Sequence, residues 1–337
     1  MLENRECLSA PIEINGVKIK NRIVVPPMAD FGATHADGLV NSRHLEHYSE
    51  FADGGAGLVI IEACSVCRIH EMRNTITLCD DSCIPGMELL ARAAKRNGTT
   101  ALVQLLNAGM EYLPYRSASD IPRDVFCEYR QEFVDAAERC KRAGFDGVEL
   151  HAAHRFYLDQ IIETSCRSDE YGGAFENRVR LLIELICEIK ARCGQDFIVS
   201  VRFGNRSTEE LVLTGKAIEA AGGNLLNVST GFGMYNKPKD FPYDARVYAA
   251  SLVKRETSLP VICVGNISDG DTAEQILRAG YADMVAVGRG HLCDPAWGSK
   301  VLSGRVPFGC LHCKNCMWRI DGSRCPMAIK RRKAEKQ

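Results

Sequence analysis

Short runs of apolar residues alternate with longer amphipathic stretches along almost the whole chain. The runs are apolar nearly throughout and rich in β-branched side chains, which is typical of parallel strands that are covered on both faces. We expect eight strands, at Arg22–Pro26, Gly57–Glu62, Thr100–Leu105, Gly147–His151, Phe197–Arg202, Leu225–Ser229, Pro260–Val264 and Met284–Val287. Eight strand–helix units in succession predict an α/β fold, a (β/α)8 TIM barrel, ahead of a doubly wound sheet.

The amphipathic stretches between these runs are expected to be helices. They lie at Ser42–Asp53, Gly86–Arg96, Cys127–Ala143, Glu176–Arg192, Thr208–Ala221 and Asp271–Ala279. Glycines such as Gly194 and Gly280 close them just before the next strand, as helix C-termini favour. Before the first strand, two alternating segments flank Asn15-Gly16, which is a strong hairpin signal. We expect this hairpin to plug the bottom of the barrel.

Composition and charge narrow the class of protein. The 337 residues carry a formal net charge of −1, which gives no basis for binding nucleic acid or an anionic membrane. No apolar stretch reaches the roughly 20 residues of a spanning helix, and the N-terminus lacks a signal-peptide core, so we expect a cytoplasmic protein. The barrel pattern ends near Gly304, which predicts a barrel over residues 1–304 and a cysteine-rich appendage over residues 305–337.

The last two predicted strands end in residues suited to a phosphate group. Chemistry in TIM barrels gathers at the carboxyl ends of the strands, and these two strands end in Gly265-Asn266 and Gly288-Arg289. Glycines there let backbone N–H groups approach an anion, and Arg289 can add a bidentate contact. Either glycine alone would be explained equally well by a tight turn. The two together predict a phosphate site.

Two histidines follow the fourth predicted strand. His151 and His154 lie where the chain leaves the sheet, so both can donate hydrogen bonds to one carbonyl or carboxylate oxygen of a substrate. A metal site is an alternative, because Glu149 shares a strand face with His151 and could be a third ligand. Satisfied structural histidines are the remaining alternative.

Four of the sixteen cysteines gather near the C-terminus, at Cys310, Cys313, Cys316 and Cys325. This spacing, with Pro326 after the last cysteine, is typical of an iron–sulfur cluster. Structural zinc is the alternative, with all four cysteines or with three of them and His312 as ligands. Cys64 and Cys67 share a Cys-x2-Cys spacing but have no partners nearby in sequence, so we interpret them as incidental thiols.

Several longer motifs occur in a fixed order along the predicted barrel. They are Asn-Arg-Ile-Val-Val-Pro-Pro-Met at 21–28, Gly-Phe-Asp-Gly-Val-Glu-Leu-His-Ala-Ala-His at 144–154, Arg-Ser-Asp-Glu-Tyr-Gly-Gly at 167–173, Glu-Asn-Arg at 176–178, Ala-Val-Gly-Arg at 286–289 and Asp-Pro at 294–295. With them the chain resembles the Old Yellow Enzyme family of NAD(P)H:flavin oxidoreductases, over nearly the whole barrel.

This resemblance implies an FMN site and assigns its residues. Four residues would lie along the isoalloxazine, two would bond its pyrimidine edge and four would hold the phosphate. In this order they are Pro27, Met28, Ala29 and Ala63; Gln104 and Arg202; and Gly265, Asn266, Gly288 and Arg289. The charge of Arg202 would stabilise an anionic reduced flavin. His151 and His154 would bind the electron-withdrawing group of an activated alkene.

One branch of the family also implies the second cofactor. This branch, similar to 2,4-dienoyl-CoA reductase and trimethylamine dehydrogenase, carries a 4Fe–4S cluster just after the barrel, which favours a cluster over zinc here. The sequence has no Gly-x-Gly-x-x-Gly motif for a second dinucleotide domain. We therefore expect an external electron-donor protein, with NAD(P)H as the alternative donor, and leave self-association into a homo-oligomer open.

The departures from the family pattern all lie on the substrate side. Phe156 stands where family members usually carry a proton-donating tyrosine, and Tyr157 follows it. Asn107 and Met110 replace a histidine and an arginine of the family, and the loop from Met110 to Asp124 is short. Tyr157, water or a cysteine would then donate the proton. The substrate itself stays open.

The function expected from these features is an FMN- and iron–sulfur-dependent ene-reductase. It would reduce a small unsaturated molecule at a C=C bond conjugated to a carbonyl, carboxylate or thioester. Two alternatives remain: an oxidative enzyme similar to trimethylamine dehydrogenase, and a non-catalytic electron-transfer subunit whose substrate pocket has decayed.

Overall fold

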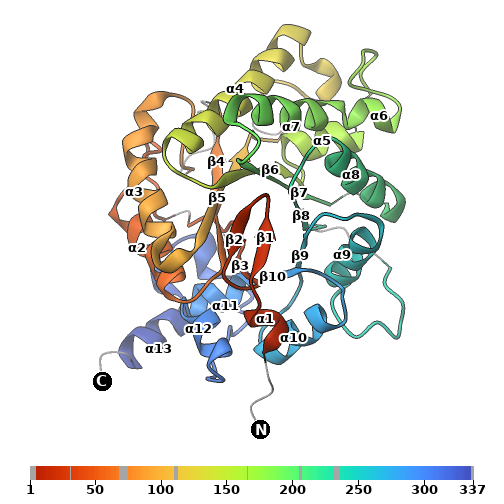
Figure 1. Ribbon diagram of the computed structural model, residues 1–337. Coiled ribbons are helices and arrows are strands. Elements are labelled where there is room, and N and C mark those ends of the chain that lie inside the picture. Colours follow the sequence, from red (N-terminus) through yellow and green to blue (C-terminus); the bar gives the residue numbers. More distant parts are fainter. Residues whose placement is uncertain are drawn as a thin grey trace.

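Eight parallel strands close into a barrel in the computed structural model, which describes residues 5–30, 32–67, 75–109, 113–164, 166–204, 207–230 and 236–334. The strands run in chain order around the barrel, and β10 pairs with β3 to close it (Figure 1). Their bounds are β3 Ile23–Val25, β4 Leu58–Ser65, β5 Thr100–Leu106, β6 Gly147–Ala152, β7 Ile198–Phe203, β8 Leu225–Val228, β9 Val261–Val264 and β10 Met284–Ala286. The TIM-barrel prediction is confirmed.

Helices surround the barrel and carry the chain back to its amino end (Figure 1). Those of the barrel are α1 Glu6–Ser9, α2 Ser42–Asp53, α3 Ile84–Ala94, α4 Arg123–Arg142, α5 Tyr157–Thr164, α6 Phe175–Arg178, α7 Arg180–Cys193, α8 Thr208–Ala220, α9 Ala245–Glu256, α10 Gly270–Arg278, α11 Gly288–Cys293 and α12 Trp297–Leu302. The single helix expected over residues 176–192 is two helices, because Val179 (φ −84°, ψ −8°) interrupts the regular backbone between α6 and α7.

The barrel interior has an apolar lower half that the N-terminal hairpin closes. The hairpin strands β1 (Ile12–Ile14) and β2 (Val17–Ile19) turn at Asn15 and Gly16, whose φ values of 52° and 78° match a two-residue turn of this kind. Ile14 and Ile19 are fully buried against apolar side chains from the strands of the barrel. Figure 1 shows the hairpin inside the ring of strands. The expected plug is confirmed, and it leaves the opposite end for chemistry.

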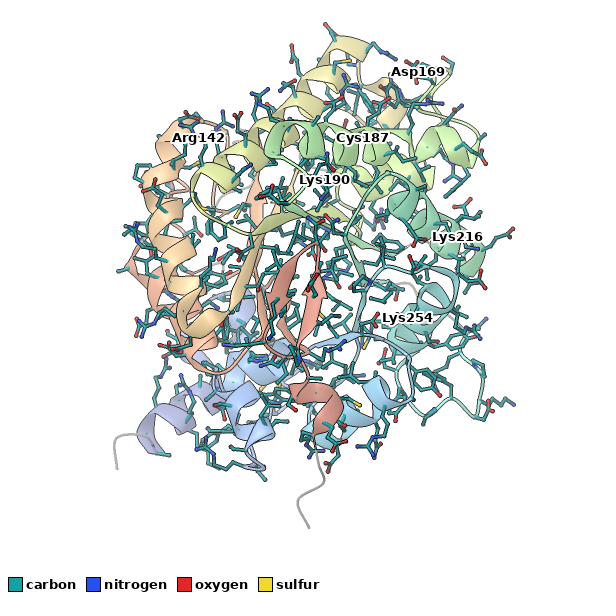
Figure 2. The ribbon with its side chains drawn as sticks, in the orientation of Figure 1. Arg142, Asp169, Cys187, Lys190, Lys216 and Lys254 are labelled. Carbon is teal, nitrogen blue, oxygen red and sulfur yellow. The ribbon has the colours of Figure 1, made fainter. Side chains whose placement is uncertain are left out.

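Ion pairs and hydrogen bonds join neighbouring segments of the outer layer, where the labelled side chains of Figure 2 lie. Lys216 of α8 pairs with Glu256 of α9 at 2.7 Å, and Arg142 of α4 pairs with Asp81 at 2.7 Å. Exposed pairs of this kind contribute between 0 and about 1 kcal/mol each. The buried strands and the apolar side chains packed against them therefore determine the fold, while these ion pairs contribute little to its stability.

The segment after α12 packs back onto the barrel. It contains two short turns, η5 (Met317–Arg319) and η6 (Gly322–Arg324), and helix α13 (Pro326–Ala334), which contacts α11. Arg43 of α2 pairs with both Asp30 and Asp321 at 2.8 Å, which ties the segment to the barrel. None of the helices in the described part of the chain is long and apolar enough to cross a membrane.

Gly147 tests the packing of the barrel wall. A Cβ at this position would overlap the Ile198 carbonyl oxygen of the adjacent strand, and a strand held on both sides cannot move away. We expect Gly147→Ala to lower the free energy of unfolding by about 3 kcal/mol. Gly309→Ala is the matched control, because a Cβ there meets nothing within 4 Å, and we expect it to change stability by less than about 0.5 kcal/mol. Urea unfolding measures both, and equal effects would contradict this packing.

Candidate functional site

A cavity of about 310 Å³ opens at the carboxyl end of the barrel. Its lining combines residues of β7, β9 and β10 with residues that follow β3, β9 and β10. Seven residues predicted to hold FMN line it: Pro27, Met28, Arg202, Gly265, Asn266, Gly288 and Arg289. Of the other three, Gln104 is buried in the barrel interior, while Ala29 and Ala63 are half-buried at the ends of β3 and β4. The structure thus brings most of the predicted set together.

The end of this cavity near β9 and β10 is suited to a phosphate. Gly265 and Asn266 both have positive φ, 143° and 48°, so the chain turns sharply there. Arg289 donates to the Asn266 side-chain oxygen at 2.6 Å, and Asn266 donates to Asp244 at 2.7 Å. Arg246, which also lines the cavity, pairs with Asp244 at 2.8 Å. The sequence pattern missed Asp244 and Arg246, because they belong to a connection that carries no motif.

Below the cavity, a buried carboxylate organises the polar half of the barrel interior. Glu149 is fully buried, and its oxygens accept hydrogen bonds from Gln104 and Asn227 at 2.8 Å and from Ser200 at 3.3 Å. Burial raises the pKa of Glu149, while attraction to Arg202 opposes that shift. All these partners come from neighbouring strands. Glu149 therefore joins neighbouring strands by accepting hydrogen bonds from them. This role gives no support to the alternative in which Glu149 and the two histidines bind a metal ion.

His151 and His154 lie side by side above this buried carboxylate. Their rings are perpendicular with centroids 5.1 Å apart, and the backbone at His154 and Arg155 is left-handed (φ 62° and 66°). Two such non-glycine residues in succession carry strain, which is common at functional sites. Nε2 of His154 lies 2.9 Å from Oγ of Ser229, and that oxygen also accepts from Arg202 at 3.2 Å. Ser229 therefore joins the histidine pair to the arginine, a link that no sequence motif indicated.

Burial keeps both histidines neutral. It lowers the pKa of His154 to about 3 and that of His151 well below its usual value, and the nearby charge of Arg202 lowers both pKa values further. The Nδ1 atom of His151 is buried and has no hydrogen-bond partner among the described residues. A neutral imidazole can still donate one hydrogen bond. Neither histidine is among the residues that line the cavity, and Ser229 links the pair to Arg202, which does line it.

The structure does not bring Tyr157 together with the histidines. Its ring packs between helices against Phe126 and Tyr129 of α4, with centroids 6.3 and 5.6 Å away. The hydroxyl is buried and has no hydrogen-bond partner in the described ranges. Phe156 lies beside His151 instead, with ring centroids 4.9 Å apart. Proton donation by Tyr157 stays a prediction, with less geometric support than the histidine pair has.

Comparison with known proteins identifies the family. The chain matches the sequence profile of the NADH:flavin oxidoreductase / NADH oxidase family over residues 7–307. It belongs to this family. The match confirms the resemblance to the Old Yellow Enzyme family and shows an oxidoreductase. It supports FMN and a nicotinamide nucleotide as cofactors but does not address an iron–sulfur cluster.

Individual relatives agree with this assignment. The chain is 36% identical to an NADH oxidase of Thermoanaerobacter brockii over 87% of its own length and 50% of the relative. It is 30% identical to a cinnamate reductase of Clostridium sporogenes over 95% of its length and 57% of the relative. A solved 6-hydroxypseudooxynicotine amine oxidase from Pseudomonas geniculata N1 is 27% identical, with a TM-score of 0.79 over 94% of this chain and 52% of that one. This flavin oxidoreductase chain thus spans about half the length of these relatives.

Asn107, Cys64 and Cys67 are not among the residues that line the cavity at the carboxyl end of the barrel. Cys67 lies 3.2 Å from the side-chain oxygen of Asn107, and the Cys64 thiol donates to the Glu62 carbonyl at 3.2 Å. Both cysteines are buried, which agrees with their interpretation as incidental thiols. Met110 lies outside the described residues.

The four C-terminal cysteines line one cavity of about 240 Å³ beside α11. Cys293, at the end of α11, lines it too, and its thiol interacts with those of Cys310 and Cys325. The sequence pattern missed Cys293 because it is distant from the motif in sequence. Across the described ranges, no group of three or more His, Cys, Asp or Glu side chains lies close enough together to hold a metal ion. The structure therefore places the predicted ligands around one space without showing a finished metal centre.

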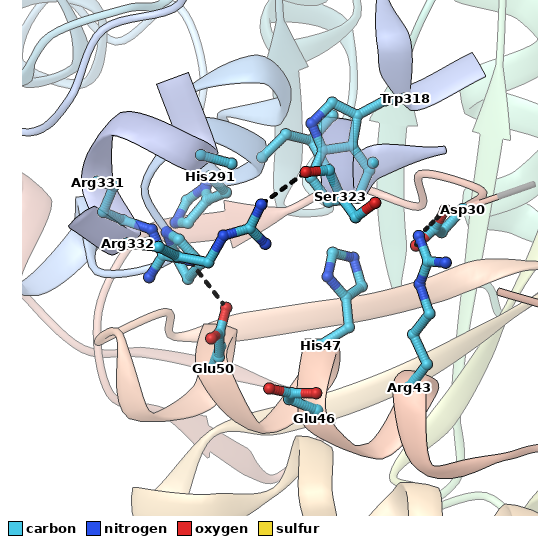
Figure 3. Close-up of a pocket in the computed structure, with 14 residues that line it drawn as sticks. Asp30, Arg43, Glu46, His47, Glu50, His291, Trp318, Ser323, Arg331 and Arg332 are labelled. Atoms are coloured by element: carbon cyan, nitrogen blue, oxygen red, sulfur yellow. Dashed lines mark hydrogen bonds and ion pairs between the residues drawn. The ribbon is translucent and has the colours of Figure 1, made fainter. Parts of the chain in front are cut away.

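A third cavity, of about 290 Å³, separates α2 from the C-terminal segment (Figure 3). Arg331 pairs with Glu50 across it at 3.5 Å, and the His47 ring lies 5.3 Å from that of Trp318. Trp318 also lines the cysteine cavity. His291 lines the cavity between α2 and the C-terminal segment, and burial lowers its pKa to about 4. The C-terminal segment therefore rests on a polar interface that contains a buried neutral histidine.

His291 makes stability depend on pH. An unfolded histidine takes up a proton below pH 6.5, whereas His291 in the folded chain stays neutral until about pH 4, so stability is lost as the pH falls through this range. We expect His291→Gln to remove up to about 2 kcal/mol of the stability lost between pH 6.5 and 5. The exposed His35 provides the control variant His35→Gln. Urea unfolding at several pH values tests this, and parallel pH profiles for all three proteins would refute it.

Proposed function

We propose that this chain is an FMN-dependent ene-reductase, which reduces a C=C bond conjugated to a carbonyl, carboxylate or thioester. The observation that carries the proposal is the neutral pair His151 and His154, joined through Ser229 to Arg202 in the lining of the cavity. FMN, when bound, supplies a hydride from its N5 atom to the β-carbon of the alkene. The name of the cinnamate reductase relative agrees with this class of reaction.

The cavity residues would hold FMN and favour its reduced form. Arg202 would place a buried positive charge at the pyrimidine edge, where negative charge gathers on reduction, and such a charge acts strongly away from water. Burial lowers the pKa of Arg202, and the negative charge of Glu149 opposes this shift. Arg289 would hold the phosphate, with Gly265 and Gly288 allowing close approach. A Cβ on Gly288 would lie 3.2 Å from the Met28 sulfur and would narrow this end of the cavity.

The histidine pair would bind the substrate's electron-withdrawing group. Two neutral donors that converge on one oxygen stabilise the negative charge that develops there as the β-carbon accepts a hydride. Both histidines are neutral near pH 7, because burial lowers their pKa values. Phe156, whose ring lies beside that of His151, would offer the substrate an apolar contact at the position where the family usually has a tyrosine. The α-carbon would take its proton from water, from a cysteine or from Tyr157.

The four cysteines would bind a 4Fe–4S cluster. Their common cavity supports this part of the proposal, and four thiolates suit iron–sulfur clusters. Residues 305–337 would then be a cluster-binding appendage of the barrel that receives electrons from an external donor protein. Hydride transfer from NAD(P)H over the flavin is the alternative route, and it agrees with the family.

The likeness to an amine oxidase keeps an oxidative function as the second candidate. In that case the flavin would accept electrons from an amine, and the cysteine site would pass them outward. A non-catalytic electron-transfer subunit is less well supported, because such a protein has no need of the paired histidines. Anaerobic assays separate the three: alkene consumption supports the reductase, acceptor reduction by an amine supports the oxidative enzyme, and neither reaction supports the subunit.

The histidine pair offers a direct test of the reductase. We expect His151→Ala and His154→Ala each to retain flavin but to slow the reduction of enones or unsaturated acids by on the order of 100-fold, because a preorganised donor is lost. The exposed His35→Ala variant is the control. Turnover and bound flavin are measured on the same samples. Wild-type turnover in both histidine variants would rule out the proposed role.

The cluster can be tested independently of the histidines. Cys316→Ser should lower the bound iron and sulfide and the turnover with a low-potential one-electron donor, while flavin stays bound. Cys187→Ser is the matched control, because Cys187 is an exposed cysteine on α7, far from the motif in sequence. Iron analysis and the visible spectrum report the cluster directly. Full turnover of cluster-free protein with the one-electron donor would contradict the electron route.

A further inference from the structure

Helix α11 lines both the cavity proposed to hold flavin and the cavity of the C-terminal cysteines. The two cavities share four lining residues, Arg289, Leu292, Cys310 and His312. The turn that carries Cys310 and His312 therefore forms part of the wall of the cavity proposed to hold flavin, at the end proposed to bind its phosphate. A change in the conformation of this turn must alter both sites.

Arg289 is held from two sides by hydrogen bonds. Its Nη2 donates to Asn266 at 2.6 Å, and its Nη1 donates to Nδ1 of His312 at 2.8 Å. A guanidinium has five N–H groups, so these two bonds leave others for an anion. Because both bonds fix the plane of the guanidinium, Arg289 is already oriented before a phosphate arrives. His312 accepts one of the two hydrogen bonds that orient Arg289.

His312 connects this arginine to the first cysteine of the motif. Its backbone is left-handed (φ 51°), a conformation that non-glycine residues rarely adopt. In this conformation its N–H donates to the sulfur of Cys310 at 3.4 Å, while its side chain accepts from Arg289. One residue thus bonds a predicted cluster ligand through its backbone and the predicted phosphate ligand through its ring.

We propose that His312 is a positioning residue that couples the two cofactor sites: a filled cysteine site strengthens FMN binding, and bound FMN strengthens retention of the cluster. The inference rests on the proposed function and deepens it. Thiolates bound to iron hold the turn in the conformation that places the ring of His312 on Arg289, so the phosphate meets an arginine that is already ordered. Because linkage is reciprocal, the same factor must describe both effects.

The size of the effect follows from typical coupling between sites. We expect the Kd for FMN to be about 5- to 50-fold lower with the cluster than without it. The measurement uses the full-length chain without oxygen, stripped of flavin, with the cluster present or removed by a chelator. Quenching of FMN fluorescence gives the Kd. Release of iron to the chelator, with and without FMN, gives the reciprocal factor.

Two variants separate coupling from simple loss of structure. Asparagine tolerates the left-handed backbone, so His312→Asn should keep the N–H bond to Cys310 but lose the reach to Arg289. We expect this variant to retain iron and to bind FMN equally well with and without the cluster. Lys330→Ala, an exposed substitution in the C-terminal segment that lies outside both cavity linings, should keep the wild-type factor.

The outcomes distinguish this inference from the proposed function. Wild-type protein that carries neither flavin nor iron would defeat the proposed function itself. Wild-type protein that carries both, with one Kd for FMN regardless of the cluster, would overturn only the coupling, as would a wild-type factor in His312→Asn. If His312→Asn fails to retain iron, the wild-type iron-release rates decide: slower release with FMN supports the coupling, and equal rates reject it.

Discussion

The pairing of β10 with β3 is the constraint on which the site depends. Val285 pairs with Ile23 and Ala286 with Val24, so the last strand of the barrel lies against the first. Without this closure, the turn that carries Gly288 and Arg289 would be separated by nearly the whole sheet from Pro27 and Met28. With it, both segments line one cavity. The hairpin supports the closure from below, because it fills the lower interior with apolar side chains that need no hydrogen bonds.

The upper interior has the opposite character, and this contrast gives the site its electrostatics. Glu149 and Arg202 are both buried, and a buried charge is tolerated only with a partner and hydrogen bonds. The amides and hydroxyls of neighbouring strands provide those bonds around Glu149. The positive charge of Arg202 in turn helps to keep His154 neutral. A single network of buried groups thus holds the cation proposed to face the flavin and keeps the proposed substrate donors neutral.

The sequence predicted the parts of this arrangement that depend on local pattern. Eight apolar runs, an Asn-Gly turn and glycines at strand ends each have a local physical cause, so the strands, the hairpin and the turns after β9 and β10 were all predictable. Ser229, Asp244 and Cys293 were not, because their roles come from contacts with residues far away in sequence. Tyr157 illustrates the same limit: its position beside Phe156 suggested the active site, but one residue further along the first turn of α5 its ring points into the layer of α4.

The position of α11 explains why two cofactor sites would share one short element. The chain leaves β10 at the carboxyl end of the barrel, and α11, which is only six residues long, ends at Cys293 beside the C-terminal cysteines. A helix rises about 1.5 Å per residue, so its two ends lie only about 9 Å apart. Any centre held by these cysteines would therefore lie near the flavin without a dedicated connecting domain. The topology of the barrel brings the two sites close together. The hydrogen bonds of Arg289 and His312 then connect them, so that under the proposed coupling a change at one site alters binding at the other.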